Sequence, residues 1–104
     1  MALPFTRQSS EGLLQASDPK TPRSELVHLA VHRSPEVRAA VAARRDCPFA
    51  TMLALVYDSH DDVLEALTVN PNVPRAVLEV LMTHRHEKIR IMSEQRLRFM
   101  VEVA

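Results

Sequence analysis

Prolines recur in this chain at a fixed interval of 26 residues that no insertion interrupts. Pro22, Pro48 and Pro74 have this spacing. Two apolar columns keep the same register: Leu29, Leu55 and Leu81, and Val37, Val63 and Ile89. An uninterrupted repeat of roughly 20–50 residues is typical of stacked supersecondary units that bury their apolar faces against one another. The repeat therefore constrains the fold more tightly than the function.

Each repeat has the pattern of two short helices. Apolar residues fall at i, i+3 and i+4 in both halves, which places each set on one helix face. The first-half sets are Leu26-Leu29-Ala30, Met52-Leu55-Val56 and Leu78-Leu81-Met82, and the second-half sets are Val37-Ala40-Val41, Val63-Ala66-Leu67 and Ile89-Met92. The recurrent proline suits the first helical turn, where its missing N–H is not needed.

The periodicity predicts helices over seven segments and no strand. The segments are 9–17, 23–33, 35–45, 49–59, 61–69, 75–85 and 87–102. We interpret 9–17 as the second helix of a partial leading repeat, and 87–102 as a C-terminal capping helix. Acidic residues open the second-half helices, where they complement the helix dipole. Ser34 is expected to be a good N-cap, and His60 and His86 poor ones.

Two segments carry a family resemblance. They are 34–42, Ser-Pro-Glu-Val-Arg-Ala-Ala-Val-Ala, and 70–81, Asn-Pro-Asn-Val-Pro-Arg-Ala-Val-Leu-Glu-Val-Leu. Over about residues 13–93 the chain resembles the leucine-rich repeat variant family, which combines an acidic turn, Val-Arg, an Ala-rich helix, Asn-Pro, a second Pro and a Leu-rich helix. The resemblance implies a right-handed all-helical solenoid without enzyme activity, in which one helix of each pair can be 3₁₀.

Two departures from the family pattern matter. The repeat is slightly longer than the family's usual unit, which leaves room for both helices to be α. Leu64 stands where the Val-Arg pattern has Arg, so an arginine ladder from Arg38 to Arg90 would be interrupted. We therefore expect an all-α, right-handed α-solenoid with repeats near 20–45, 46–71 and 72–96, forming one domain over 9–104 after a flexible segment 1–8.

Charge is balanced overall but unevenly placed. The formal net charge is zero. Residues 46–74 hold five acidic and no basic residues, between two mildly basic ends. A neutral chain is a weak candidate for nucleic-acid binding, which needs concentrated positive charge. Nucleic-acid binding stays as the alternative function, through the arginines Arg38, Arg44, Arg45, Arg75 and Arg90.

The cysteine content and the hydropathy bear on location and on covalent chemistry. A single cysteine, Cys47, cannot form an internal disulfide, which suits a reducing compartment. No stretch approaches the ~18–20 apolar residues of a membrane span, and the first ten residues lack the apolar run of a signal peptide. We expect a cytoplasmic protein. Cys47 shares a column with Thr21 and Val73, so we interpret it as a packing residue, not as a nucleophile.

Histidines gather in the turns between paired helices. One column holds His32, Asp58 and His84, and a second holds His60 and His86 after Ser34. These side chains are metal-ligand types. Neighbouring repeats lie several ångströms apart, however, and exposed turns commonly use such residues as caps. We expect no metal site and no cofactor.

The remaining candidates are contact surfaces. Tyr57 is the only tyrosine, and we place it on an outer apolar strip near Ala54 and Val80, because aromatic anchors are enriched in binding hot spots. Arg38 is expected to pair with Asp58. The last helix carries more apolar residues than a cap buries, namely Leu97, Phe99, Met100, Val101 and Val103, which suggests a homodimer contact.

No spacing of nucleophile and base indicates an enzyme. We therefore predict a non-enzymatic scaffold that binds another protein through its repeat surface, as helical repeat proteins commonly do. The predicted partner-binding residues are Tyr57, Val80, Arg38, Arg44, Arg45, Arg90, Phe99 and Met100.

Overall fold

A computed structural model describes residues 7–103, with side chains described over residues 8–100. This part of the chain folds into α-helices and contains no strand. The helices are α1 (Arg7–Ser17), α2 (Arg23–Leu29), α3 (Pro35–Ala42), α4 (Phe49–Leu55), α5 (Asp61–Val69), α6 (Arg75–Leu81) and α7 (Glu87–Val103). Every helix that the periodicity predicts is present. The helices α1 and α7 flank five shorter ones.

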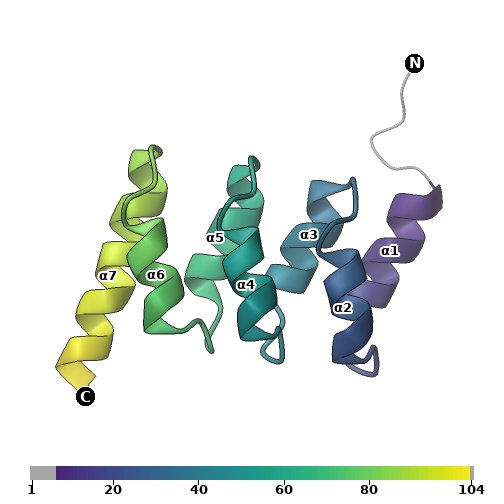
Figure 1. Ribbon diagram of the computed structural model, residues 1–104, viewed down its shortest axis with the longest axis horizontal. Helices are drawn as coiled ribbons and strands as arrows, with labels where there is room; N and C mark the ends of the chain where they lie inside the picture. The colour runs from purple at the N-terminus through teal and green to yellow at the C-terminus, as the bar shows by residue number, and fades with distance from the viewer. Residues whose placement is uncertain (1–6, 104) are drawn as a thin grey trace.

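The helices form two rows, and in Figure 1 one row lies in front of the other. The inner row consists of α1, α3, α5 and α7, and each of these helices contacts its neighbours in the row. The outer row consists of α2, α4 and α6, which pack on the inner row and make little contact with one another. The turns α2–α3, α4–α5 and α6–α7 form the upper edge in Figure 1, and the other loops form the lower edge.

The core lies between the two rows and follows the predicted columns. Leu29, Leu55 and Leu81 are all buried, and the column of Val37, Val63 and Ile89 is almost completely excluded from solvent. Met82 is the exception, because the same spacing placed it in the core and it is 40% exposed. Its counterpart Val56 is buried. Among the described residues, α6 contacts only α5 and α7 to any extent, so no further helix pair covers Met82.

Four helices end three or four residues earlier than the periodicity predicts. We expected ends at residues 33, 45, 59 and 85, whereas α2, α3, α4 and α6 end at Leu29, Ala42, Leu55 and Leu81. After each end the backbone tightens, as in α2, where the N–H of His32 donates to the carbonyl of Leu29. Such i→i−3 bonds let the chain reverse within a short turn. All the helix bodies are α, so neither member of a pair is 3₁₀.

The N-caps of α3 and α5 differ from our expectation. Ser34 does not cap α3; its hydroxyl donates to the Glu36 carboxylate at 2.7 Å, and this bond is the main cause of the lowered pKa of Glu36. His60, expected to be a poor cap, accepts a hydrogen bond at Nδ1 from the backbone N–H of Asp62 at 3.3 Å. The imidazole Nδ1 stands close to where an Asp oxygen would stand, so it serves as an acceptor in the same way.

Side chains at the lower edge join each helix pair to the helix before it. Arg44, Asn70 and Arg96 follow one another at the 26-residue interval. Each donates to two backbone carbonyls 28 and 26 residues earlier, at the end of the preceding inner helix. Asn70, for example, donates to the carbonyls of Ala42 and Arg44 at 2.7 and 2.8 Å. We call these three residues the carbonyl ladder, and it satisfies acceptors that a helix end otherwise leaves unpaired.

The first prediction concerns the core. Replacing the buried Leu55 by Ala should lower the free energy of unfolding by about 2–5 kcal/mol, because a cavity forms where the side chain was. Urea denaturation measures the loss. Leu14→Ala is the matched control, since Leu14 is 74% exposed and its loss should cost less than about 0.5 kcal/mol. Equal losses in the two variants would show that the column is not a core column.

The second prediction concerns the carbonyl ladder. Asn70→Ala should lower the free energy of unfolding by about 2–4 kcal/mol, because one buried and one partly buried carbonyl lose their donor. Asn72→Ala is the control: its amide also donates to a carbonyl, that of Arg45 at 2.9 Å, but in an exposed position where water can replace it. If thermal unfolding shows the same loss of stability in both variants, the carbonyl ladder does not stabilise the fold as we expect.

Candidate partner-binding surface

Besides the leucines that it buries in the core, the outer row presents several apolar side chains to solvent. Tyr57 is 82% exposed and Val31 is 81% exposed, and Val27 and Val80 are exposed to a smaller degree. Ala54 is exposed beside them. We call these five residues the outer strip. They come from α2, α4, α6 and the turns that follow α2 and α4. Four of them line one groove, whereas Val80, on α6, does not.

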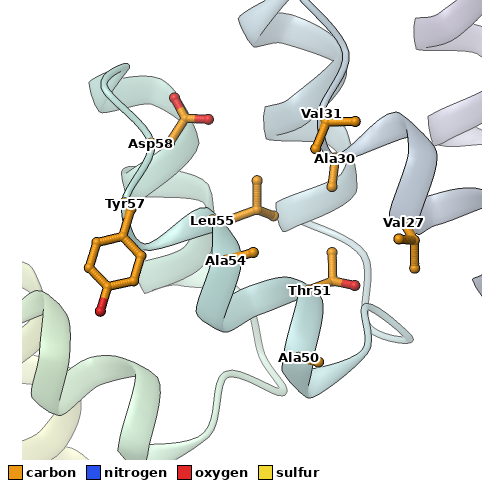
Figure 2. A pocket seen from close by; sticks show the side chains of 9 residues that line it. All are labelled: Val27, Ala30, Val31, Ala50, Thr51, Ala54, Leu55, Tyr57 and Asp58. Carbon is orange, nitrogen blue, oxygen red and sulfur yellow. The ribbon is translucent and has the colours of Figure 1, made fainter.

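A groove lies between α2 and α4 within this strip. Its volume is about 320 Å³. Figure 2 shows Val27 and Val31 on the α2 side and Ala54 with its neighbours on the α4 side. Tyr57 stands at the rim, and its ring is directed away from the two valines. The sequence placed Ala54 near Tyr57 and gave Val31 the equivalent position 26 residues earlier. The structure adds Val27 and shows that both valines line the groove that Tyr57 borders.

The end of α4 explains why Tyr57 projects outward. The N–H of Tyr57 donates to the carbonyl of Ala54, and the N–H of Asp58 donates to that of Leu55, at 3.4 and 3.0 Å. These i→i−3 bonds tighten the backbone directly after the helix. Leu55 is buried in the core while Tyr57, two residues later, is exposed. The tight helix end therefore separates a core anchor from an exposed aromatic ring.

The only carboxylate that lines the groove is already engaged. Asp58 accepts hydrogen bonds from Nε and Nη2 of Arg38 at 2.7 and 3.2 Å, which confirms the predicted pair. It also accepts one from the backbone N–H of His60 at 2.9 Å. Nη1 of Arg38 donates to the carbonyls of His32 and Arg33 in its own turn. Asp58 and Arg38 thus link two helix pairs, and neither charge is free in the groove.

The other predicted arginines do not form one basic face. Arg44 belongs to the carbonyl ladder, its side chain is 9% exposed, and it also pairs with Asp46, whose pKa it lowers by hydrogen bonding. Arg45 is exposed at the lower edge, next to Arg44. Arg75 pairs with Glu79 on the surface of α6. Arg38 and Arg90 lie toward the upper edge, so the set divides between the two edges of the molecule.

The histidines of the upper edge act as caps for their own turns. Nδ1 of His32 accepts from the N–H of Ser34 at 3.0 Å, and Nδ1 of His84 accepts from the N–H of His86 at 3.1 Å. Asp58 accepts from the residue two positions later in the same way. Among the described residues, no three His, Cys, Asp or Glu side chains gather as a possible metal site. The rings of His84 and His86 stack on each other, with their centroids 5.1 Å apart.

Cys47 is buried in the packing position that its column indicated. Thr21, Cys47 and Val73 are all buried. Burial raises the pKa of the Cys47 thiol to about 11, and the negative charge of Asp46 acts in the same direction. The thiol is therefore protonated near neutral pH, whereas a nucleophilic cysteine has to be a thiolate.

The predicted C-terminal contact residues differ in their burial. Leu97 is buried and Met100 packs against the core, so both serve as a cap for the inner row. Phe99 is 60% exposed and lies on the outer side of α7. The side chains of Val101 and Val103 lie outside the described residues.

Comparisons with known proteins identify no relative of this chain. No protein-family model matches the chain, and neither a curated protein nor a solved structure matches it. Among the described helices, none is long and apolar enough to cross a membrane.

The third prediction concerns pH. Burial, aided by His86, lowers the pKa of His84 below its ordinary value of 6.5. As the pH falls through 6.5, the unfolded chain takes up a proton at His84 that the folded chain does not, so stability falls. His84→Asn keeps an acceptor for the N–H of His86 and removes the titration. We expect a smaller loss of unfolding free energy between about pH 7.5 and pH 5.5 in this variant than in the unmodified protein.

Urea unfolding at the two pH values measures this difference. His28→Asn is the control, because His28 is an exposed histidine in the body of α2 and caps no turn. It should leave the pH dependence unchanged. An unaltered pH dependence in His84→Asn would contradict the role assigned to His84.

Proposed function

We propose that this protein is a non-enzymatic scaffold that binds another protein through the outer strip. The observation that carries the proposal is the almost fully exposed ring of Tyr57 beside an apolar groove. Exposed apolar patches on soluble proteins commonly mark interaction sites, and tyrosines are enriched among their hot spots. The groove volume, about 320 Å³, is at the lower end of ligand pockets and suits a side chain inserted by a protein partner.

We further propose that the helix pairs are three repeats of a right-handed α-solenoid of the leucine-rich repeat variant type. In this reading α1 belongs to a partial leading repeat and α7 caps the end. The carbonyl ladder supports the proposal, because the same side-chain contact recurs at 26-residue intervals between successive inner helices. A repeat array would give the outer row its regular spacing and therefore its grooves.

Nucleic-acid binding is the less favoured alternative. Arg38 and Arg44 are occupied by Asp58 and by backbone carbonyls, and Arg75 is paired with Glu79. Binding to a phosphate backbone requires several cations on one face. Arg45 and Arg90 retain accessible charge but lie toward opposite edges, so the arginines give such a ligand no continuous track.

The fourth prediction tests the outer strip by affinity capture from cells of the source organism. Tyr57→Ala and Val31→Glu should each lose a protein that the unmodified chain retains, because the first removes the aromatic anchor and the second places a charge in the groove. Val69→Glu is the control. It introduces the same charge at another exposed valine, on α5 of the inner row, and should retain the partner.

Thermal unfolding accompanies the capture experiment, so that a misfolded variant is recognised. All three variants should unfold within a few degrees of the unmodified protein, since each altered side chain is exposed. Capture of the same proteins by every variant would exclude the outer strip as the binding surface. Loss of the partner only in Val69→Glu would assign binding to the inner row.

A further inference from the structure

Arg90 repeats the position of Arg38 in the last helix pair. It lies 52 residues after Arg38, which is twice the 26-residue interval. Its Nη1 donates to the carbonyls of His84 and Arg85 at 3.0 and 2.9 Å. Nη1 of Arg38 makes the same two bonds to the carbonyls six and five residues before it. Both guanidinium groups are therefore held in one orientation by their own turns.

The two arginines differ in what their remaining donors meet. Nε and Nη2 of Arg38 hold the Asp58 carboxylate, which belongs to the next helix pair. Nε and Nη2 of Arg90 have no hydrogen-bond partner among the described residues. The intermediate position is occupied by Leu64, which is fully buried and needs no partner. Arg90 thus presents a half-buried guanidinium with two donors unused.

The acidic side chains nearest in sequence do not occupy these donors. Glu94 lies one turn further along α7 and pairs instead with Arg98 at 3.1 Å. The bonds to His84 and Arg85 hold the guanidinium toward the start of α7, away from Glu94. An arginine fixed in this way loses little further side-chain entropy when it receives a ligand.

The surroundings of Arg90 also favour a protein ligand. Ile91, next to it, is 45% exposed, so an apolar contact is available beside the cation. Glu87 and Glu94 stand exposed within about one helical turn on either side. The site therefore combines a fixed arginine fork with an apolar neighbour, which suits a carboxylate carried on a protein side chain better than a free phosphate.

We propose that Arg90 is a recognition point for a carboxylate of a partner protein. An Asp or Glu side chain would be received by Nε and Nη2 in the bidentate geometry that Arg38 and Asp58 show within the chain. The site lies on α7 near the upper edge and is separate from the outer strip. The inference stands independently of the function proposed for that strip.

The fifth prediction follows the Nε–Hε signals of the arginines by NMR while acetate replaces chloride at constant ionic strength. The Arg90 signal, assigned by its loss in Arg90→Lys, should move toward the position of the Arg38 signal, whose Nε already donates to a carboxylate. The signal of Arg98, an exposed arginine on the same helix, is the internal control and should move less. Inorganic phosphate at the same ionic strength should shift Arg90 less than acetate does.

A second variant gives a positive control. Asp58→Asn removes the carboxylate from Arg38, so the Arg38 signal should become sensitive to acetate in the way expected of Arg90. An Arg90 signal that moves no more than that of Arg98 would overturn the proposal. A larger response to phosphate than to acetate would also overturn it, since the site would then select a phosphoryl group.

Discussion

The structure depends on side-chain donors that reach the ends of preceding helices. Short helices leave many carbonyls unpaired relative to their length, and these helices are mostly seven to nine residues long. The carbonyl ladder supplies hydrogen bonds from the next helix pair, three at the first boundary and two at each of the others. The interface between successive helix pairs is therefore both hydrophobic and hydrogen-bonded. Because the donors act over 26 and 28 residues, an insertion in one pair would break the contact with its neighbour, which explains the fixed interval.

The two edges of the molecule use different chemistry for the same purpose. At the lower edge, Arg44, Asn70 and Arg96 all donate to carbonyls, so either a cation or an amide serves. At the upper edge, the boundary is an ion pair where Arg38 meets Asp58, whereas the equivalent residues of the next boundary are Leu64, which is buried, and His84, which is partly exposed. The last position returns to arginine, at Arg90. The lower edge sets the register, and the upper edge varies in charge from one boundary to the next.

These internal contacts limit which residues are free for function. Arg38 and Arg44 resemble exposed cationic candidates in the sequence, yet both are occupied within the chain. The outer row is different, because α2, α4 and α6 touch one another little and leave Tyr57 and Val31 open. The surface proposed for binding follows from this asymmetry. The inner helices contact one another along the row, whereas the outer helices bury one face in the core and keep apolar side chains accessible on the other.

The sequence by itself determined the helices, their order, the buried leucine column and the pairing of Arg38 with Asp58, because periodicity and repeat register act locally or over one fixed interval. It placed Tyr57 outside the core for the same reason. It did not determine where four helices end, that Ser34 donates to Glu36 while His60 caps its helix, or that Arg44 serves the carbonyls of another helix. Only the tertiary structure decided these points, because hydrogen bonds of similar strength compete for each polar group and packing selects among them. The tertiary structure also decided the groove beside Tyr57, because its walls come from helices that meet only when the chain is folded.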